Sequence, residues 1–275
     1  MTLRGATSSS PIALASTLWS HRDLVLQLVR RDIAGRYKGS VFGILWSLFN
    51  PIVLLIVYTL VFSVVFQAKW GTGTESQAQF ALQLFAGMIV HSLFCETLLR
   101  APTLIISNVS YVKRIVFPLE VLPVVTIGTS AFHAGISILV LTTALLIVNG
   151  SVPVTAVFLP LVLAPLTVIS LGFAWFLSSL GVYLRDVAQP ISLITTILLF
   201  ASPVFYPASA LPEYIQPWLL LNPLTFIIEQ TRAVLIAGTA PDLLGLAAYS
   251  AVALIIAMAG NFWFQKTRRG FANVL

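Results

Sequence analysis

Five long runs without any charged side chain constrain the fold of this 275-residue chain more than any other feature. The runs cover residues 39–68, 76–95, 121–184, 187–212 and 243–265. A helix that crosses a bilayer needs about 20 apolar residues, whereas membrane β-strands would appear as shorter segments of alternating polarity. The run 121–184 can hold two helices and is interrupted by the polar and proline residues of 149–153. The sequence therefore predicts an all-α integral membrane protein with six transmembrane helices, over 40–66, 80–100, 119–148, 154–183, 189–206 and 243–264.

The composition agrees with a membrane protein and indicates its orientation. Hydrophobic residues make up 58% of the chain and charged residues 9%, whereas about a quarter of the residues of a soluble domain are charged. With six spans both termini lie on one side, and of the 15 lysines and arginines only Lys69 and Arg232 fall on the other. This bias predicts cytoplasmic termini. The pI near 9.8 then reflects topology and contact with membrane lipid, and no nucleic-acid partner is expected.

Several signatures of catalysis are absent from the sequence. No Gly-Lys dipeptide occurs, which excludes a P-loop, and there is neither an HExxH nor a GxSxG motif. The single cysteine, Cys95, excludes an intrachain disulfide and a cysteine-based zinc site. An autonomous ATPase or hydrolase is therefore not expected, and we predict no catalytic residue, metal ligand or cofactor in this chain.

Residues 12–38 form an amphipathic segment with a basic face before the first span. Its cations favour a helix that lies along the cytoplasmic interface, which serves either as a positive-inside anchor or as a binding site for an anionic substrate headgroup. Gly35, Gly39 and Gly43 are spaced four apart, which predicts close helix packing where the chain enters the membrane. The candidate headgroup and gate residues are Arg30, Arg31, Asp32, Arg36, Tyr37 and Lys38.

The first span carries aromatic side chains at helical spacing. Such stripes are usually packing or interface belts. The alternative is a pore lined by aromatic rings, because the C–H faces of sugars stack on such rings without tight polar capture. The candidate channel residues are Phe42, Trp46, Phe49, Tyr58 and Phe62.

Two connections contain features beyond those of a simple loop. Residues 101–118 combine an apolar face with a basic end, which suits either a positive-inside connector or a short helix that docks on a cytosolic partner. The candidate docking residues are Asn108, Tyr111, Lys113 and Arg114. Residues 203–242 are too long and apolar for a loop, and they predict re-entrant or interfacial helices on the external side, with a seventh span as the rival interpretation.

Within 203–242 the sequence predicts a helix over 224–237. Asn222 would be its N-cap and Pro223 its first residue. Glu229 and Arg232 are three residues apart and therefore share one face of this helix. These four residues are the candidate external gate.

Three ionisable side chains lie well inside the predicted spans, namely His91, Glu96 and His133. Such groups are functional candidates in a membrane. A local contact between Glu96 and Arg100, one helical turn away, is an equally good interpretation, and a proton relay would need more partners.

An ordered series of motifs resembles the membrane subunit of ABC-type polysaccharide exporters, which move lipid-linked O antigen, capsule or teichoic acid. The most specific motif is the first, because its charges, Tyr37, Gly43, Trp46 and Pro51 occur together in order. The motifs are RRDIAGRYKGSVFGILWSLFNP at 30–51, NVSYVKRIVFP at 108–118, LRDVAQ at 184–189, SPVFYP at 202–207 and NPLTFIIEQTR at 222–232.

This resemblance implies a homodimer in the bacterial inner membrane that pairs with two nucleotide-binding ATPase subunits, which would bind the ATP and Mg²⁺. The substrate would be undecaprenyl-linked polysaccharide, with O antigen favoured, and the pyrophosphate end would meet Arg30, Arg31, Arg36 and Lys38. The loop around Asn108 to Arg114 would be the coupling helix. The implied division is a cytoplasmic interface and gate segment at 1–39, a six-helix transmembrane domain at 40–264 and a cytoplasmic tail at 265–275.

Other functions stay open at the level of the sequence. An ABC permease for a drug or small lipid would share the ATPase partner but would need no sugar-sized channel. A membrane-embedded glycosyl or acyl transferase needs a polar catalytic cluster, for which the spans offer only the three ionisable groups above. A secondary transporter is disfavoured because obvious broken-helix repeats and paired ion-binding carboxylates are missing.

Overall fold

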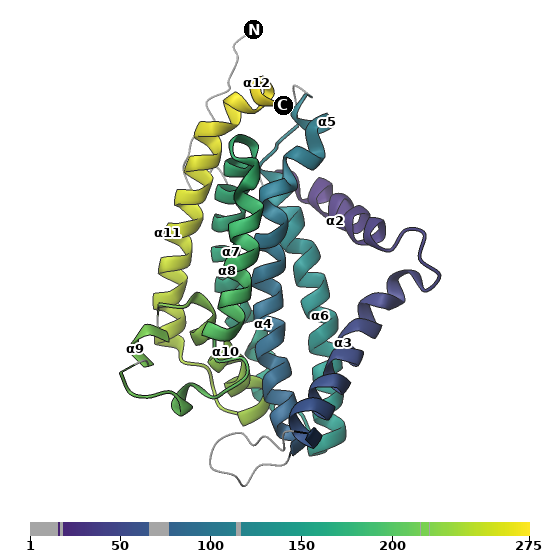
Figure 1. Cartoon of the computed structure of the whole chain (residues 1–275), viewed down its shortest axis with the longest axis vertical. Helices are drawn as coiled ribbons and strands as arrows, with labels where there is room; N and C mark the ends of the chain where they lie inside the picture. The colour runs from purple at the N-terminus through teal and green to yellow at the C-terminus, as the bar shows by residue number, and fades with distance from the viewer. Residues whose placement is uncertain (1–15, 17–18, 66–76, 114–116, 215, 220) are drawn as a thin grey trace.

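The computed structural model describes residues 16, 19–65, 77–113, 117–214, 216–219 and 221–275 (Figure 1). All regular structure within these residues is helical. Five helical segments in this part of the chain are long and apolar enough to cross a membrane: Gly43–Phe62, Ala78–Leu104, Val121–Asn149, Val154–Tyr183 and Leu243–Val274. The all-α prediction is therefore confirmed, and five of the six predicted spans coincide with candidate membrane-spanning helices. The longer helices are α2 (Arg22–Arg36), α3 (Trp46–Tyr58), α4 (Gln77–Leu104), α6 (Val121–Asn149), α7 (Leu159–Tyr183), α8 (Ala188–Ala201), α10 (Pro223–Arg232) and α11 (Leu243–Thr267).

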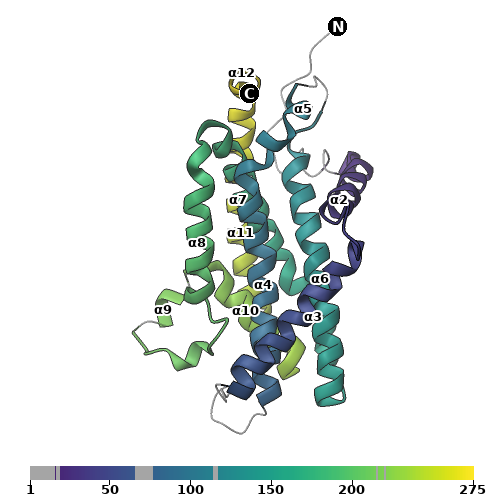
Figure 2. The ribbon, with the colours of Figure 1, turned by 45° about the vertical axis from the view of Figure 1, so that its right-hand side comes forward.

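The centre of the bundle is α4, which contacts α3, α6, α7, α8 and α10. Figure 2 shows it between α8 on one side and α3 on the other. In its most apolar segment 78% of the residues are buried, against 11% in that of α3. A helix that is apolar all round is expected in such an enclosed position. The fully buried side chains of Leu84 and Phe94 belong to this core.

The break predicted between the third and fourth spans is confirmed. Gly150 ends α6 with a φ of +73°, a left-handed conformation that glycine adopts without the steric penalty of a side chain, and its N–H donates to the carbonyl of Leu146. The chain then turns through the short 3-10 helix Val154–Phe158 into α7.

The predicted fifth span, 189–206, is shorter than expected. Helix α8 has 14 residues and ends at Ala201, because Ser202 is extended and is followed by Pro203, which disfavours helical backbone at the preceding residue. Figures 1 and 2 show α7 ending near α5 (Val109–Val112) and α11 beginning at the opposite end of the bundle, so α8 carries the chain between the two ends. The short helices α9 (Gln216–Leu219) and α10 lie at that opposite end.

The glycines at the entry to the first span do not pack against another helix, which corrects the sequence prediction. A Cβ atom built on Gly35, Gly39 or Gly43 would meet no atom within 4 Å. Gly39 and Gly43 instead have φ values of +84° and +52° and form the turn between α2 and α3. Their spacing reflects the conformational freedom that a sharp turn requires.

The final residues, predicted to form a tail, are packed against the bundle. Helix α11 continues through the 3-10 helix Arg268–Gly270 into α12 (Phe271–Val274), and the ring of Phe271 is fully buried. Arg268 forms an ion pair of 2.8 Å with the buried Glu120, and the indole of Trp175 donates to the carbonyl of Glu120. The ion pair joins the end of α11 to the beginning of α6, and the indole joins α7 to the same place.

The crossing of α7 and α11 depends on two glycines. A Cβ atom on Gly260 would overlap the carbonyl group of Gly172, and one on Gly172 would lie 2.7 Å from the carbonyl oxygen of Ile256. The two backbones therefore touch directly, as small residues permit between membrane helices.

We expect Gly260→Val to separate α7 from α11 and to lower the free energy of unfolding by about 3 kcal/mol, because an overpacked backbone contact cannot relax by rotating a side chain. The measurement is the thermal unfolding midpoint of the purified protein in detergent. Gly135→Val is the matched control, since a Cβ at Gly135 meets nothing within 4 Å. Equal midpoints for the two variants would contradict this account of the crossing.

Candidate functional site

Two ion pairs hold α2 against the centre of the bundle. Asp32 accepts two hydrogen bonds from the guanidinium of Arg100 on α4, at 2.6 and 2.9 Å, and a third from the hydroxyl of Thr129 on α6 at 2.8 Å. One turn further along α2, Arg36 forms an ion pair of 2.6 Å with Glu96, also on α4. A carboxylate that receives several charge-assisted hydrogen bonds is strongly positioned. Glu96 and Arg100 therefore pair with α2, and the local pair between them that the sequence permitted is not formed.

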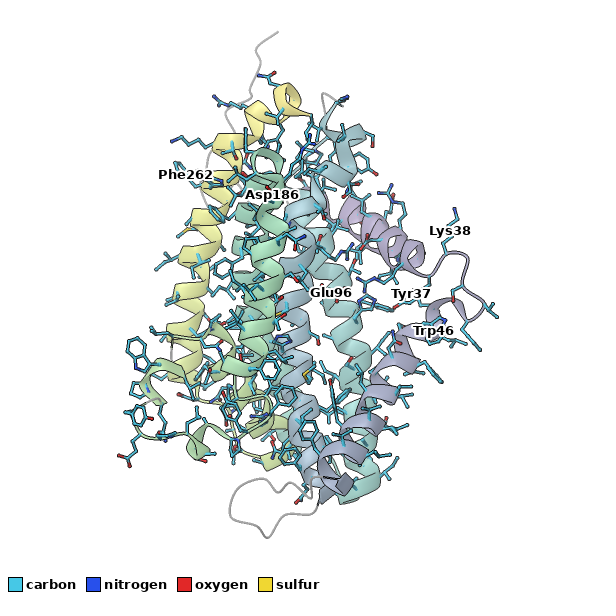
Figure 3. The ribbon with its side chains drawn as sticks, viewed as in Figure 1. Tyr37, Lys38, Trp46, Glu96, Asp186 and Phe262 are labelled. Carbon is cyan, nitrogen blue, oxygen red and sulfur yellow. The ribbon has the colours of Figure 1, made fainter. Side chains whose placement is uncertain are left out.

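His133 on α6 completes the second pair. Its Nδ1 lies 3.0 Å from the guanidinium of Arg36, and its Nε2 lies 3.2 Å from the hydroxyl of Tyr37. The same Nδ1 lies 3.3 Å from both carboxylate oxygens of Glu96, so it faces the donor Arg36 and the acceptor Glu96 together. The fixed charges of this cluster are those of the Arg36–Glu96 pair. Figure 3 shows Tyr37 and Glu96 at one level of the bundle.

A cavity of about 270 Å³ adjoins this cluster, between α2, α3, α4 and α6. Ser47, Asn50 and Tyr58 of α3 line one side, and Ser92 of α4 and Ser137 of α6 lie on the other. The sequence pointed to Arg36, Tyr37 and Tyr58 here. Asn50, Ser92 and Ser137 were missed, because a single polar residue in an apolar span gives no periodic signal.

The aromatic stripe of the first span divides into two groups. Phe42, Trp46 and Phe49 make successive edge-to-face contacts, with ring centroids 5.7 and 5.5 Å apart. These rings lie on the exposed side of α3, where the exposed fractions of Phe42 and Phe49 are 61% and 56%. They border a second, apolar cavity of about 240 Å³ together with Leu45.

The second aromatic group lies at the end of the bundle opposite α5. Tyr58 contacts Phe62, whose ring stacks on Phe80 of α4 and on Phe205 at 5.9 and 5.8 Å, and Phe205 stacks in turn on Phe200 of α8. Aromatic pairs of this kind stabilise a fold by more than the burial of their apolar surface alone. The sequence identified Tyr58 and Phe62 but not their three partners. The SPVFYP motif, which contains Phe205, was the available signal.

The predicted docking segment contacts α2 directly. Tyr111 of α5 stacks on Phe117 at 4.3 Å, and the guanidinium of Arg31 lies over the Tyr111 ring at 5.6 Å. Such a cation–π contact contributes about 0.5–1 kcal/mol at an exposed site. Asn108 donates to the carbonyl of Leu104 at the end of α4, and Lys113 is exposed. Arg114 lies outside the described residues.

The remaining basic candidates are Arg30 of α2 and Lys38, which follows the end of that helix. Both are exposed, and Figure 3 shows the side chain of Lys38 extending outward. Arg36, in contrast, is engaged by Glu96 and His133.

The four residues that the sequence predicted as an external gate lie together on α10 and its N-cap, at the end of the bundle opposite α5. Asn222 accepts from the N–H of Leu224 as the predicted N-cap, and Glu229 forms an ion pair of 3.1 Å with Arg232. The buried guanidinium of Arg232 also donates to the carbonyls of Gln83 on α4 and Val204. Burial lowers the pKa of Arg232 to about 10, and the Glu229 carboxylate opposes that shift, so Arg232 stays charged at neutral pH. Helix α10 ends at Arg232, and residues 233–237 continue as a π-helix.

We expect Arg100→Gln to loosen α2 from the bundle, because Asp32 loses its two charge-assisted hydrogen bonds. A cysteine in place of Ile33, which is buried on α2, reports this opening through the rate of maleimide labelling, while the native Cys95 is buried. If the free energy that holds α2 against the bundle falls by about 1 kcal/mol, labelling should be about fivefold faster. Leu26→Cys, at a 55% exposed position of α2, is the control and should react equally in both backgrounds. An unchanged rate at position 33 would contradict the role of the Asp32–Arg100 pair in holding α2 against the bundle.

The comparisons with known proteins identify the family. The model of the ABC-2 type transporter family matches residues 23–236. An O-antigen export system permease protein RfbA from Myxococcus xanthus is 28% identical over 265 residues, which cover 95% of this chain and 99% of that protein. Two proteins of the same name from Klebsiella pneumoniae are 25% and 26% identical, each over 92% of this chain and 95% of its own length. The chain is thus a multi-pass membrane protein that belongs to the ABC-2 type transporter family.

Proposed function

We propose that this chain is the permease subunit of an ATP-driven exporter that moves lipid-linked polysaccharide, with O antigen as the favoured substrate, outward across the bacterial inner membrane. The observation that carries the proposal is the match to relatives named O-antigen export permeases over at least 92% of the chain. The aromatic face of α3 supports it, because a polymer rich in hydroxyl groups can slide along exposed rings.

The proposed topology has six crossings, with α8 as the fifth. Although α8 has only 14 residues, it takes the chain from the end that carries α5 to the end that carries α10. The end of the bundle that carries α5 is rich in basic residues. Lys113 follows α5, Arg185 follows α7, and Arg268 and Arg269 follow α11, so the positive-inside bias makes this end cytoplasmic. On this basis α10 lies on the external side as a gate element, and both termini are cytoplasmic.

The active unit in this proposal is a homodimer with two ATPase subunits. The second copy would cover the exposed aromatic face of α3, so that Phe42, Trp46 and Phe49 line a channel between the copies. The ATPase subunits, which bind ATP and Mg²⁺, would dock at α5. This chain needs no cofactor in that scheme.

Movement of α5 reaches the bundle through α2. ATP binding in the partner would displace α5, and the contact of Arg31 with Tyr111 would pass this displacement to α2. Two ion pairs tie α2 to α4, and the hydrogen bond from Thr129 to Asp32 ties it to α6. A displacement of α2 would therefore move the entrance of the channel. Arg30 and Lys38 are exposed and suit the pyrophosphate of the substrate, whereas Arg36 is already paired.

We expect the chain to co-purify with a nucleotide-binding subunit and to confer ATPase activity that lipid-linked polysaccharide stimulates. Tyr111→Ala should reduce this stimulation at least severalfold, because it removes the ring that connects α5 to α2. Tyr214→Ala is the control, since Tyr214 is 75% exposed near the opposite end. Stimulation by a hydrophobic drug or a short lipid in place of the polysaccharide would overturn the substrate assignment.

We also expect the double variant Trp46→Ala, Phe49→Ala to reduce surface polysaccharide while the complex still assembles. Both rings are partly or largely exposed in the single chain, so their truncation should affect the proposed channel more than the fold. The measurement is export of polysaccharide in cells, together with co-purification of the ATPase subunit. Normal surface polysaccharide in this variant would eliminate the role of these rings in the channel.

A further inference from the structure

The polar cavity behind α3 contains hydrogen-bonding groups without partners. Within the described residues, the amide of Asn50 and the hydroxyls of Tyr58 and Ser92 make no hydrogen bond. Ser137 donates to the carbonyl of His133 and keeps its acceptor capacity. Asn50 and Ser92 are exposed, and this set of polar side chains borders the cavity, so its members can form hydrogen bonds with an occupant.

The charges of the wall argue for a neutral occupant. Arg36 is the cation of the cavity, and its guanidinium is neutralised by the Glu96 carboxylate at 2.6 Å. A phosphate or pyrophosphate placed here would gain no net attraction and would be close to the Glu96 carboxylate. Anion binding therefore belongs elsewhere on α2.

The chemistry of the wall suits a sugar ring. Each sugar hydroxyl can both donate and accept, and Asn50, Ser92 and Tyr58 offer the same dual capacity. The Arg36–Glu96 pair adds charged donors and acceptors at one edge. Tyr37 and Phe85 also line the cavity, and their aromatic side chains add apolar surface for the C–H face of a sugar. A hydrocarbon tail would leave these polar groups unpaired, at a cost of about 1–3 kcal/mol each.

The size of the cavity limits what it can hold. Its volume of about 270 Å³ is near the lower end of ligand pockets, which begin at about 300 Å³. This is room for a single ring and excludes a folded oligosaccharide.

We propose that this cavity binds one neutral sugar residue, which gives the permease a polar sugar-recognition subsite separate from the exposed aromatic face of α3. The inference rests on the proposed function, since it assumes a saccharide substrate. The hydroxyl groups of that sugar form hydrogen bonds with Asn50, Ser92, Tyr58 and the Arg36–Glu96 pair. The subsite lies beside the ion pairs that hold α2 against the bundle. Arg36 and Glu96 belong both to one of these pairs and to the wall of the cavity, so sugar binding and the position of α2 affect the same side chains.

The test uses the full complex in cells that produce the polysaccharide. The photoreactive residue benzoylphenylalanine replaces Leu54, which lines the cavity and is 44% exposed, and in a control chain it replaces Leu139, which is 59% exposed on α6 and does not line the cavity. After irradiation, the chain is probed with an antibody to the polysaccharide. We expect saccharide adducts at position 54 and none at position 139.

A second variant tests the polar groups themselves. Asn50 is exposed on α3, and Asn50→Leu keeps a good helix former of similar size, so the fold should be retained. Loss of one or two hydrogen bonds to the sugar predicts a three- to tenfold decrease in the adducts at position 54. Thr143→Val, at an exposed position of α6, is the matched control and should leave the adducts unchanged.

Two results would overturn the inference alone. One is the absence of saccharide adducts at position 54 in cells that export polysaccharide normally, which would indicate a cavity filled by solvent or lipid. The other is an equal yield of adducts in the Asn50→Leu background. If inactivation of the whole chain left surface polysaccharide unchanged, the proposed function would fail, and the sugar subsite would fail with it.

Discussion

The structure depends on the enclosure of α4. This helix is surrounded by α3, α6, α7, α8 and α10, so its apolar side chains are packed among helices while the outer helices remain open to lipid or to another chain. Because α4 is enclosed, the two charged residues in its last third must find partners within the bundle. Glu96 and Arg100 find them on α2, which is why an otherwise peripheral helix has a fixed position.

The same enclosure connects the two ends of the molecule. At one end, α4 leads to α5, whose Tyr111 contacts Arg31 of α2. At the other end, the carbonyl of Gln83 on α4 accepts from Arg232 of α10, and Phe80 joins the aromatic group that includes Phe205. A central helix with other elements attached at both ends can transmit a displacement along its length, which is what the proposed ATP-driven transporter with a cytosolic motor requires.

The sequence predicted the helices well because their signals are local. The uncharged runs located five spans, the residues around Gly150 located the break between α6 and α7, and Asn222 with Pro223 located the beginning of α10. The site was predicted less completely because its contacts join distant segments. Arg100 was one turn from Glu96 in the sequence, yet its partner is Asp32, 68 positions away. The period of a helix shows which residues share a face, but not which helix that face meets, and so the division of the aromatic stripe into two groups could not be anticipated.

The charges inside the bundle also distinguish structural from transport roles. Glu96 is paired with Arg36, and the Nδ1 of His133 lies within hydrogen-bond distance of both side chains. A proton-coupled pump needs such groups to exchange protons with water during each cycle, whereas here each charge keeps a helix in place. The groups left without partners beside this pair are neutral amides and hydroxyls. In the function proposed above, energy for transport comes from outside the bundle through α5, and the bundle contributes a surface that fits a neutral, hydroxyl-rich substrate.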